Sequence, residues 1–111
     1  MITLDDDMRQ VLYILCQHCV DIMGGWMPYP MWAIAEQSKF SKWKTRKTLN
    51  KLRDAGYCEV ISEILSEDNL LPYRGWTITK KAHETDEYKR ANLKEAKLCA
   101  ECFGGNYEQY L

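Results

Sequence analysis

Two pairs of cysteines, each with two residues between them, are the clearest candidates for chemistry in this sequence. The first pair is Cys16 and Cys19, in CQHC, and the second is Cys99 and Cys102, in CAEC. Four thiolates can hold a zinc ion tetrahedrally if the two segments lie side by side. The same spacing also arises when a helix face packs against a core, because cysteine is often a small buried apolar residue. The sequence leaves three interpretations open: packing, a structural zinc site, and thiol redox chemistry.

Other patterns of catalytic residues are absent from the sequence. The two histidines, His18 and His83, lie in expected helices without a neighbouring motif, and Cys58 falls in an expected strand. The sequence has no glycine-rich phosphate loop, no HExxH motif and no nucleophile elbow. We therefore expect no enzyme activity, no small-molecule substrate, and no cofactor apart from the zinc ion considered above.

The positive charge of the chain is concentrated in the stretch from Lys39 to Arg53. The whole sequence has 15 Lys and Arg against 16 Asp and Glu, a net charge of −1. This stretch holds seven of the basic residues and no acidic one. Segregated positive charge is typical of a surface that binds a polyanion such as nucleic acid, although charge runs also occur on solvated helix faces.

Length and composition are those of an ordinary globular chain. With 111 residues, 46% hydrophobic and 28% charged, one domain with a modest core is expected. The longest apolar run, 11–16, is far too short to span a membrane, and the acidic N-terminus is unlike a signal peptide. We expect a cytoplasmic protein whose cysteines stay reduced, without membrane association.

Periodicity and turn residues predict the helices of the first half. Apolar residues recur at helical spacing over 8–22, with Thr3 as the expected N-cap and Gly24-Gly25 as the expected end. The two prolines of WMPYP, 26–30, favour an extended connector or a short edge strand. A second helix is predicted over 31–38.

The second half is predicted to contain a third helix, a hairpin and a long helix. Ser41 is the expected N-cap of a helix that reaches Ala55. Strands are predicted over 57–65 and 73–79, joined by the loop SEDNLLP. A polar helix over about 80–103 follows, with an interruption near Thr85.

The order of three helices, with a tight turn between the second and third, and then a β-hairpin is that of a winged helix-turn-helix. IAEQSKFS, 34–41, resembles the second helix and turn of that family, with Phe40 as its apolar plug. TRKTLNKLRDAGY, 45–57, resembles the third helix, and WTITKKA, 76–82, resembles the last wing strand passing into a helix. The resemblance covers roughly residues 8–82.

This resemblance, to winged helix-turn-helix regulators that include short bacterial and phage members, implies the fold class. The expected fold is mainly α with a small β-hairpin: a three-helix core, a wing and a long C-terminal helix. A single domain is expected over 1–103, with a flexible tail over 104–111.

In the family the third helix enters the major groove, so the resemblance implies binding of double-stranded DNA through the helix at 41–55. At about 100° per residue, Thr45, Thr48, Leu49 and Leu52 share the face that would pack on the core. The candidate DNA-binding residues are Ser41, Lys42, Trp43, Lys44, Arg46, Lys47, Asn50, Lys51 and Arg74.

These candidates have different expected roles. Phosphate contacts are assigned to Lys42, Lys44, Lys47 and Lys51. Arg46 suits guanine and Asn50 suits adenine, because a guanidinium group or an amide can form two hydrogen bonds with the edge of the base. Trp43 has two readings, contact with a sugar or thymine methyl, or packing against the turn near Phe40.

The expected wing departs from the family pattern. Its tip carries Glu67 and Asp68, where members that insert the wing into a minor groove carry Lys or Arg. Arg74 is the one basic residue of the expected wing, so the wing lacks the basic tip with which such members contact DNA.

The leading hypothesis is a transcription regulator that binds DNA through the helix at 41–55. It is expected to be a homodimer, with the C-terminal helix as the dimer contact. The alternative is a protein-interaction module, such as a phage-type inhibitor or adaptor, which keeps the fold without binding DNA. The acidic wing favours this alternative, and the basic stretch opposes it. A third hypothesis joins DNA binding to zinc or thiol sensing.

Overall fold

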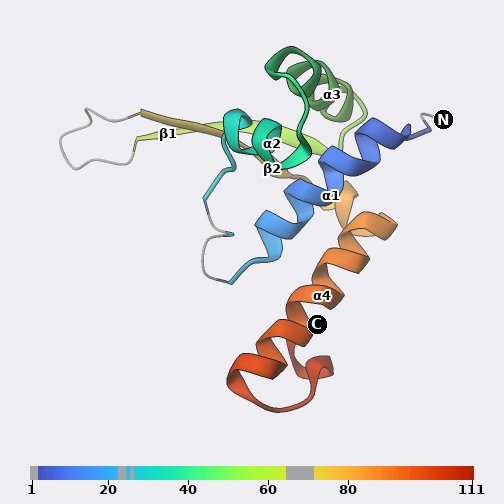
Figure 1. Cartoon of the computed structure of the whole chain (residues 1–111), viewed down its shortest axis with the longest axis vertical. Helices are drawn as coiled ribbons and strands as arrows, with labels where there is room; N and C mark the ends of the chain where they lie inside the picture. The colour runs from blue at the N-terminus through green and yellow to red at the C-terminus, as the bar shows by residue number, and fades with distance from the viewer. Residues whose placement is uncertain (1–2, 23–24, 26, 65–71) are drawn as a thin grey trace.

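The computed structural model describes residues 3–22, 25, 27–64 and 72–111. Its elements follow the predicted order: α1 (Asp6–Val20), α2 (Met31–Ser38), α3 (Lys42–Asp54), β1 (Cys58–Ile64), β2 (Pro72–Ile78), the 3-10 helix η1 (Lys80–Glu84), α4 (Asp86–Phe103) and the 3-10 helix η2 (Tyr107–Tyr110). Figure 1 shows α3 and α4 at opposite ends of the molecule, with the hairpin projecting to one side. The fold is a winged helix-turn-helix with an additional C-terminal helix, as the sequence predicted.

The hydrophobic core is built around α1. Four residues on its inner side are completely buried, because helical periodicity turns them toward the same side of the helix. The residues of the core with 0% exposure are Val11, Leu12, Leu15 and Cys16 from α1, Ile34 from α2, Leu49 and Leu52 from α3, and Ala82 from η1. The helices α2, α3 and α4 all pack on α1.

Both ends of α1 differ from the prediction. The N-cap is Asp5 rather than Thr3, and a side-chain oxygen of Asp5 accepts a hydrogen bond of 2.8 Å from the Met8 amide. At the other end α1 stops at Val20, and the extended backbone of Asp21 follows it. Ile22, which the periodicity had included, is 58% exposed. Gly24 lies outside the described residues.

The turn between α2 and α3 is fixed by local hydrogen bonds. Lys39 adopts the left-handed conformation, with φ of 64°, and the Phe40 amide donates to Ser38 Oγ at 3.2 Å. Ser41 then caps α3 as predicted, because its Oγ accepts from the Lys44 amide at 3.1 Å. These bonds set the angle at which α3 leaves the core.

The hairpin carries one face toward the core. Val60 pairs with Trp76, and Ser62 with Arg74, so these four residues lie on the same face of the antiparallel pair. Tyr29 adds a bridge to Trp76 through two backbone hydrogen bonds of 2.7 and 2.8 Å. The connector at 26–30 thus supplies a short edge strand at Tyr29. The predicted loop SEDNLLP, with Glu67 and Asp68, lies almost entirely outside the described residues.

The predicted long helix is divided at Thr85, whose Oγ1 accepts from the Tyr88 amide and begins α4. The start of α4 is attached to α1 by an ion pair of 2.9 Å between Arg9 Nη1 and Glu87 Oε1. Arg90 lies over the ring of Tyr13, with 4.5 Å between the guanidinium carbon and the ring centroid. These contacts hold α4 against the side of α1 that faces away from α3 (Figure 1).

The tail, predicted to be flexible over 104–111, contains η2 in this structure. The Tyr110 hydroxyl donates to the Gly104 carbonyl at 2.9 Å, and Lys97 Nζ lies 5.6 Å from the ring centroid of Tyr107. These contacts fold the chain back against the end of α4.

Burial of the inner face of α3 predicts the result of a pair of substitutions. Leu49→Ala should lower the free energy of unfolding by about 2–5 kcal/mol, because it leaves a cavity in the core. Lys47→Ala, on the outer face of the same helix, should change it by less than about 0.5 kcal/mol. Urea unfolding followed by circular dichroism measures both. Equal losses in the two variants would contradict this orientation of α3.

Candidate nucleic-acid interface

The helix α3 presents a buried face and a basic face, and the predicted division between them is confirmed. Thr45 and Leu52 are 0% exposed, and Thr48 and Leu49 are at most 4% exposed. The two threonine hydroxyls donate to the carbonyls of Ser41 and Lys44, one turn earlier, which satisfies their polar groups in the core. The opposite face is left for contacts outside the chain.

Trp43 lies on this outer face and does not pack against the turn. Its side chain is 71% exposed, and Lys47 Nζ lies 5.0 Å from its ring centroid. Phe40 is instead covered by Lys44, whose Nζ is 4.2 Å from the ring centroid. Of the two readings of Trp43, the structure therefore favours an indole available for external contact.

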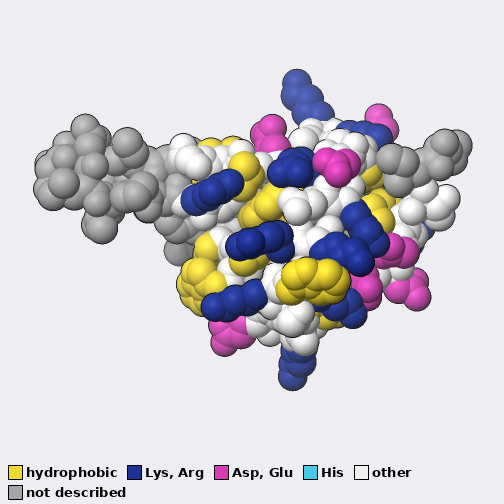
Figure 2. Space-filling view, turned by 90° about the horizontal axis from the view of Figure 1, so that it is seen from above, with side chains coloured by type: hydrophobic (Ala, Val, Ile, Leu, Met, Phe, Trp, Pro, Cys, Tyr) yellow, Lys and Arg dark blue, Asp and Glu magenta, His cyan; other side chains and the backbone are white. Residues whose placement is uncertain are grey.

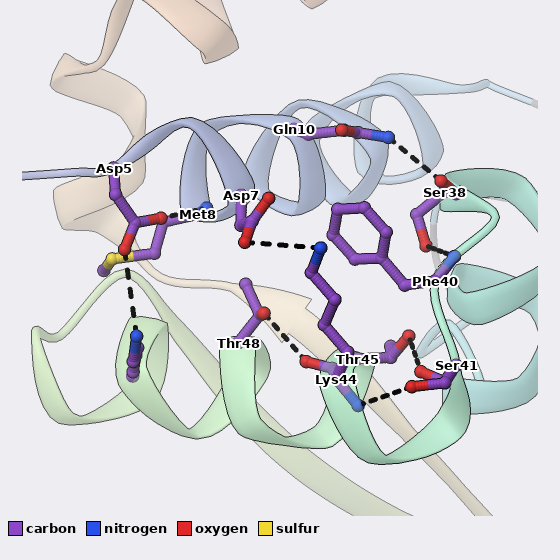
Figure 3. A network of polar contacts seen from close by, with 11 residues as sticks. Asp5, Asp7, Met8, Gln10, Ser38, Phe40, Ser41, Lys44, Thr45 and Thr48 are labelled. Atoms are coloured by element: carbon purple, nitrogen blue, oxygen red, sulfur yellow. Dashed lines mark hydrogen bonds and ion pairs between the residues drawn. The ribbon is translucent and has the colours of Figure 1, made fainter.

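Two of the four lysines assigned to phosphates are paired with acidic residues of α1 and its cap. Lys44 Nζ is 3.6 Å from Asp7 Oδ2, and Lys51 Nζ is 3.8 Å from Asp5 Oδ2. Figure 3 shows the side chains of Asp7 and Lys44 pointing toward one another between the two helices. All four side chains are about half exposed, so water and salt screen these pairs.

The remaining lysines of the outer face are free to meet a polyanion. Within the described part of the chain, neither Lys42 nor Lys47 takes part in an ion pair. Figure 2, which views the molecule from the side of α3, shows Lys and Arg side chains spread across this face. The net positive charge of the face therefore comes mainly from Lys42, Lys47 and the arginines described next.

Arg46 and Asn50 form a ridge, one helical turn apart, between two clefts. The first cleft, of about 410 Å³, lies along the outer face of α3 and includes Trp43 and Lys47. The second, of about 450 Å³, lies between α3 and β2 and includes Arg53 and Arg74. Arg46 and Asn50 line both clefts. The structure thus brings Arg74 to the other candidate residues, although it is distant from them in sequence.

Arg53 is a member of this group that the sequence interpretation did not include among the candidates. It follows Arg46 by seven residues and Asn50 by three, so all three lie along one stripe of α3. That spacing was the available signal. The sequence does not show that the hairpin forms a second wall beside Arg53, and this wall is what adds Arg53 to the group.

The four thiols proposed as zinc ligands are not gathered into one site. Cys16 is fully buried in the core, Cys19 Sγ lies 3.6 Å from Thr77 Oγ1, and Cys102 is exposed. Among the described residues, no three side chains of the His, Cys, Asp or Glu type lie together so as to hold a metal ion. The physical reason is that each thiol is placed by the packing of its own helix: Cys16 turns into the core, Cys19 meets β2 at Thr77, and Cys102 stays exposed at the end of α4.

The remaining candidate groups have structural contacts. His18 stacks on Tyr29 with 4.0 Å between ring centroids, and its Nε2 lies 2.7 Å from the Met27 carbonyl oxygen. Cys58 Sγ donates to the Leu49 carbonyl at 3.6 Å. These contacts attach α1 to the connector and β1 to α3.

The helices of the described residues include none with the length and apolar character needed to cross a bilayer.

Comparison with solved structures finds a similar fold in the crystal structure of ZitR, a zinc-responsive MarR family member of Lactococcus lactis. The two chains are 21% identical, with a TM-score of 0.53, over 97% of this chain and 68% of the other. At this identity the likeness establishes the winged-helix fold alone. No protein-family model and no curated protein matches the sequence.

Burial of the thiols predicts their reactivity. Burial raises the pKa of Cys16 and of Cys58 from 9.0 to about 12, so both stay protonated near pH 8. Iodoacetamide should therefore alkylate exposed Cys102 in the native protein, and Cys16 and Cys58 only after unfolding. In the unfolded chain these thiols ionise near pH 9, whereas in the folded chain they stay protonated up to about pH 12. The free energy of unfolding should therefore decrease as the pH rises from about 9 toward 12. Mass spectrometry of the labelled peptides gives the order, and rapid native labelling of Cys16 would contradict it.

Proposed function

We propose that this chain is a transcription regulator that binds double-stranded DNA by placing α3 in the major groove. The observation that carries the proposal is the outer face of α3. It combines cationic side chains, an amide and an exposed indole, while the opposite face of the same helix is fixed in the core. A helix held in this way can enter a groove without rearrangement of the fold.

The roles of the side chains follow from their chemistry and position. Arg46 and Asn50, on the ridge between the clefts, are the proposed base-reading pair, because a guanidinium suits guanine and an amide suits adenine. Lys42 and Lys47 are the proposed phosphate contacts. Ser41 caps the N-terminus of α3, which favours a phosphate nearby. Trp43 is placed to contact a sugar or a thymine methyl.

Lys44 and Lys51 have a smaller proposed part in binding. Their ammonium groups already lie beside Asp7 and Asp5, so a phosphate would have to compete with these carboxylates. The carboxylates would also repel a nearby DNA strand. We therefore assign most of the phosphate affinity to Lys42, Lys47 and the arginines.

The proposed assembly is a homodimer formed through α4, which lies far from α3 in Figure 1. The exposed apolar residues of α4 include Leu98, at 45% exposure, and Phe103, at 67%. A symmetric dimer would present two copies of α3 to half-sites about one helical turn apart.

A second candidate function is a protein-interaction module without DNA binding. The pairing of Lys44 and Lys51 with carboxylates supports it, because this reduces the positive charge available to DNA. Zinc sensing has weaker support. The similar structure is of a zinc-responsive protein, but the thiols of this chain lie apart in the described residues, so zinc is not included in the proposal.

The proposed contacts predict different effects for two kinds of substitution. Lys47→Ala should weaken binding to every duplex and flatten the slope of log affinity against log salt by about one, because each phosphate contact contributes roughly 0.9. Arg46→Ala or Asn50→Ala should cost about 1–3 kcal/mol on the preferred site and much less on random DNA. Fluorescence anisotropy with selected and random duplexes at two salt concentrations measures both effects.

Lys89→Ala on α4 is a matched control, because it removes one exposed positive charge on the side of α4 opposite Leu98, and it should leave binding nearly unchanged. If the Lys47 and Arg46 variants bound duplex DNA like the wild type, the groove-binding role of α3 would be wrong. The interaction-module hypothesis would then take its place.

The assembly is tested by placing charge on two exposed apolar residues of α4. The double variant Leu98→Glu and Phe103→Glu should be monomeric, because two carboxylates would have to be buried in the dimer interface. Since both side chains are exposed in the described chain, the fold should be retained. Sedimentation velocity at micromolar concentrations measures the mass. A monomeric wild-type chain under the same conditions would contradict the proposed dimer.

A further inference from the structure

The second cleft, between α3 and β2, contains more positive charge than a packing role explains. We call it the arginine cleft, and its polar lining is Arg46, Asn50, Arg53 and Arg74. Its volume is about 450 Å³, and Gly75 and Trp76 also line it. Three guanidinium groups from two different elements thus border one space.

Among the described residues, few acidic side chains compensate the guanidinium groups of the cleft. In the described residues the one ion pair of these arginines joins Arg53 Nε to Asp54 Oδ1 at 3.6 Å, and both side chains are at least 48% exposed. Alternation along β1 places Glu59 on the face of the hairpin opposite Val60, which lines the cleft. Like charges that share a space repel one another, so binding of an anion would relieve this repulsion.

The wall that carries Arg74 is held firmly. Trp76, two residues further along β2, is 7% exposed and is bonded to Tyr29 through both of its backbone polar groups. Gly75 allows the segment of Pro28 and Tyr29 to approach β2 closely, because a Cβ at position 75 would lie 2.6 Å from the carbonyl carbon of Pro28. The strand backbone that carries Arg74 is therefore held in place without a ligand, as in most ligand sites.

The chemistry of the lining selects the class of ligand. A guanidinium donates two parallel hydrogen bonds to a phosphoryl group or a carboxylate. A carboxylate has two oxygens, whereas a phosphoryl group presents three or more and can accept from arginines on both walls. The volume is in the range of small-molecule sites and far exceeds that of a single ion. The space therefore also accommodates the sugar or base that carries the phosphoryl group.

We infer that the arginine cleft binds the phosphoryl group of a nucleotide, with Arg53 and Arg74 as its main contacts. The nucleotide has two possible sources. One is a unit of the DNA strand beside α3, and this source rests on the proposed function. The other is a free nucleotide, which requires no DNA binding. The chemistry of recognition is the same for both.

The test uses the full chain and the variants Arg53→Gln and Arg74→Gln, which leave the ridge of Arg46 and Asn50 intact. Duplex binding is measured by fluorescence anisotropy, and binding of adenosine 5′-monophosphate by titration calorimetry, with adenosine as the probe that lacks the phosphoryl group. If the source is the DNA strand, each variant should bind duplex about tenfold more weakly, as expected for loss of a charged hydrogen bond. If the source is a free nucleotide, the wild type should bind the monophosphate and not adenosine, and both variants should lose this binding.

Lys89→Gln on α4 is the control, because it removes one exposed charge that lines neither cleft and lies opposite Leu98 on α4. Circular dichroism melts check that the arginine variants remain folded. The inference is overturned if both variants bind duplex like the wild type and the wild type does not bind the monophosphate. Duplex binding that depends on Lys47 but not on Arg53 or Arg74 would leave the proposed function intact. Nucleotide binding by the wild type without any duplex binding would support the arginine cleft as a nucleotide site and contradict the proposed function.

Discussion

The structure depends on the burial of one stripe of α1. Val11, Leu12, Leu15 and Cys16 are completely shielded from water, and α2, α3, the hairpin and α4 all contact this helix. Because α1 supplies the surface on which α3 packs, the buried face of α3 is determined by hydrophobic burial rather than by its own charges. The basic side chains are then left on the solvent-facing side of α3.

A second consequence is electrostatic. The N-terminal end of α1 favours acidic residues, and Asp5 caps it, while α3 lies alongside with its lysines. The stabilisation of one helix end thus neutralises part of the charge on another helix. The positive face is consequently displaced from Lys44 and Lys51 toward Lys47 and the ridge of Arg46 and Asn50. Arg53 and Arg74 extend it toward the hairpin.

The spacing of two residues between cysteines is compatible with metal binding and also with packing in a helix. A pair separated by two residues suits a metal when it lies on a turn, but within α1 it places Cys16 in the core and Cys19 beside Thr77. Burial then keeps the Cys16 thiol protonated, with its pKa raised to about 12. In this chain the first pair contributes to the packing of α1 against its neighbours.

The sequence by itself determined the helices, the Ser41 cap, the winged-helix order and the inner face of α3, because these depend on periodicity and on neighbouring residues. The local pattern predicted wrong ends for α1. The helix is capped by Asp5 rather than Thr3, and it stops at Val20, before the exposed Ile22. Only the tertiary structure decided which charges meet. The Asp5 and Asp7 pairs, the separation of the four thiols, and the cleft that joins Arg74 to Arg53 all depend on distances between elements remote in sequence. Such distances are determined by how helices and strands pack on a common core, which one-dimensional spacing does not specify.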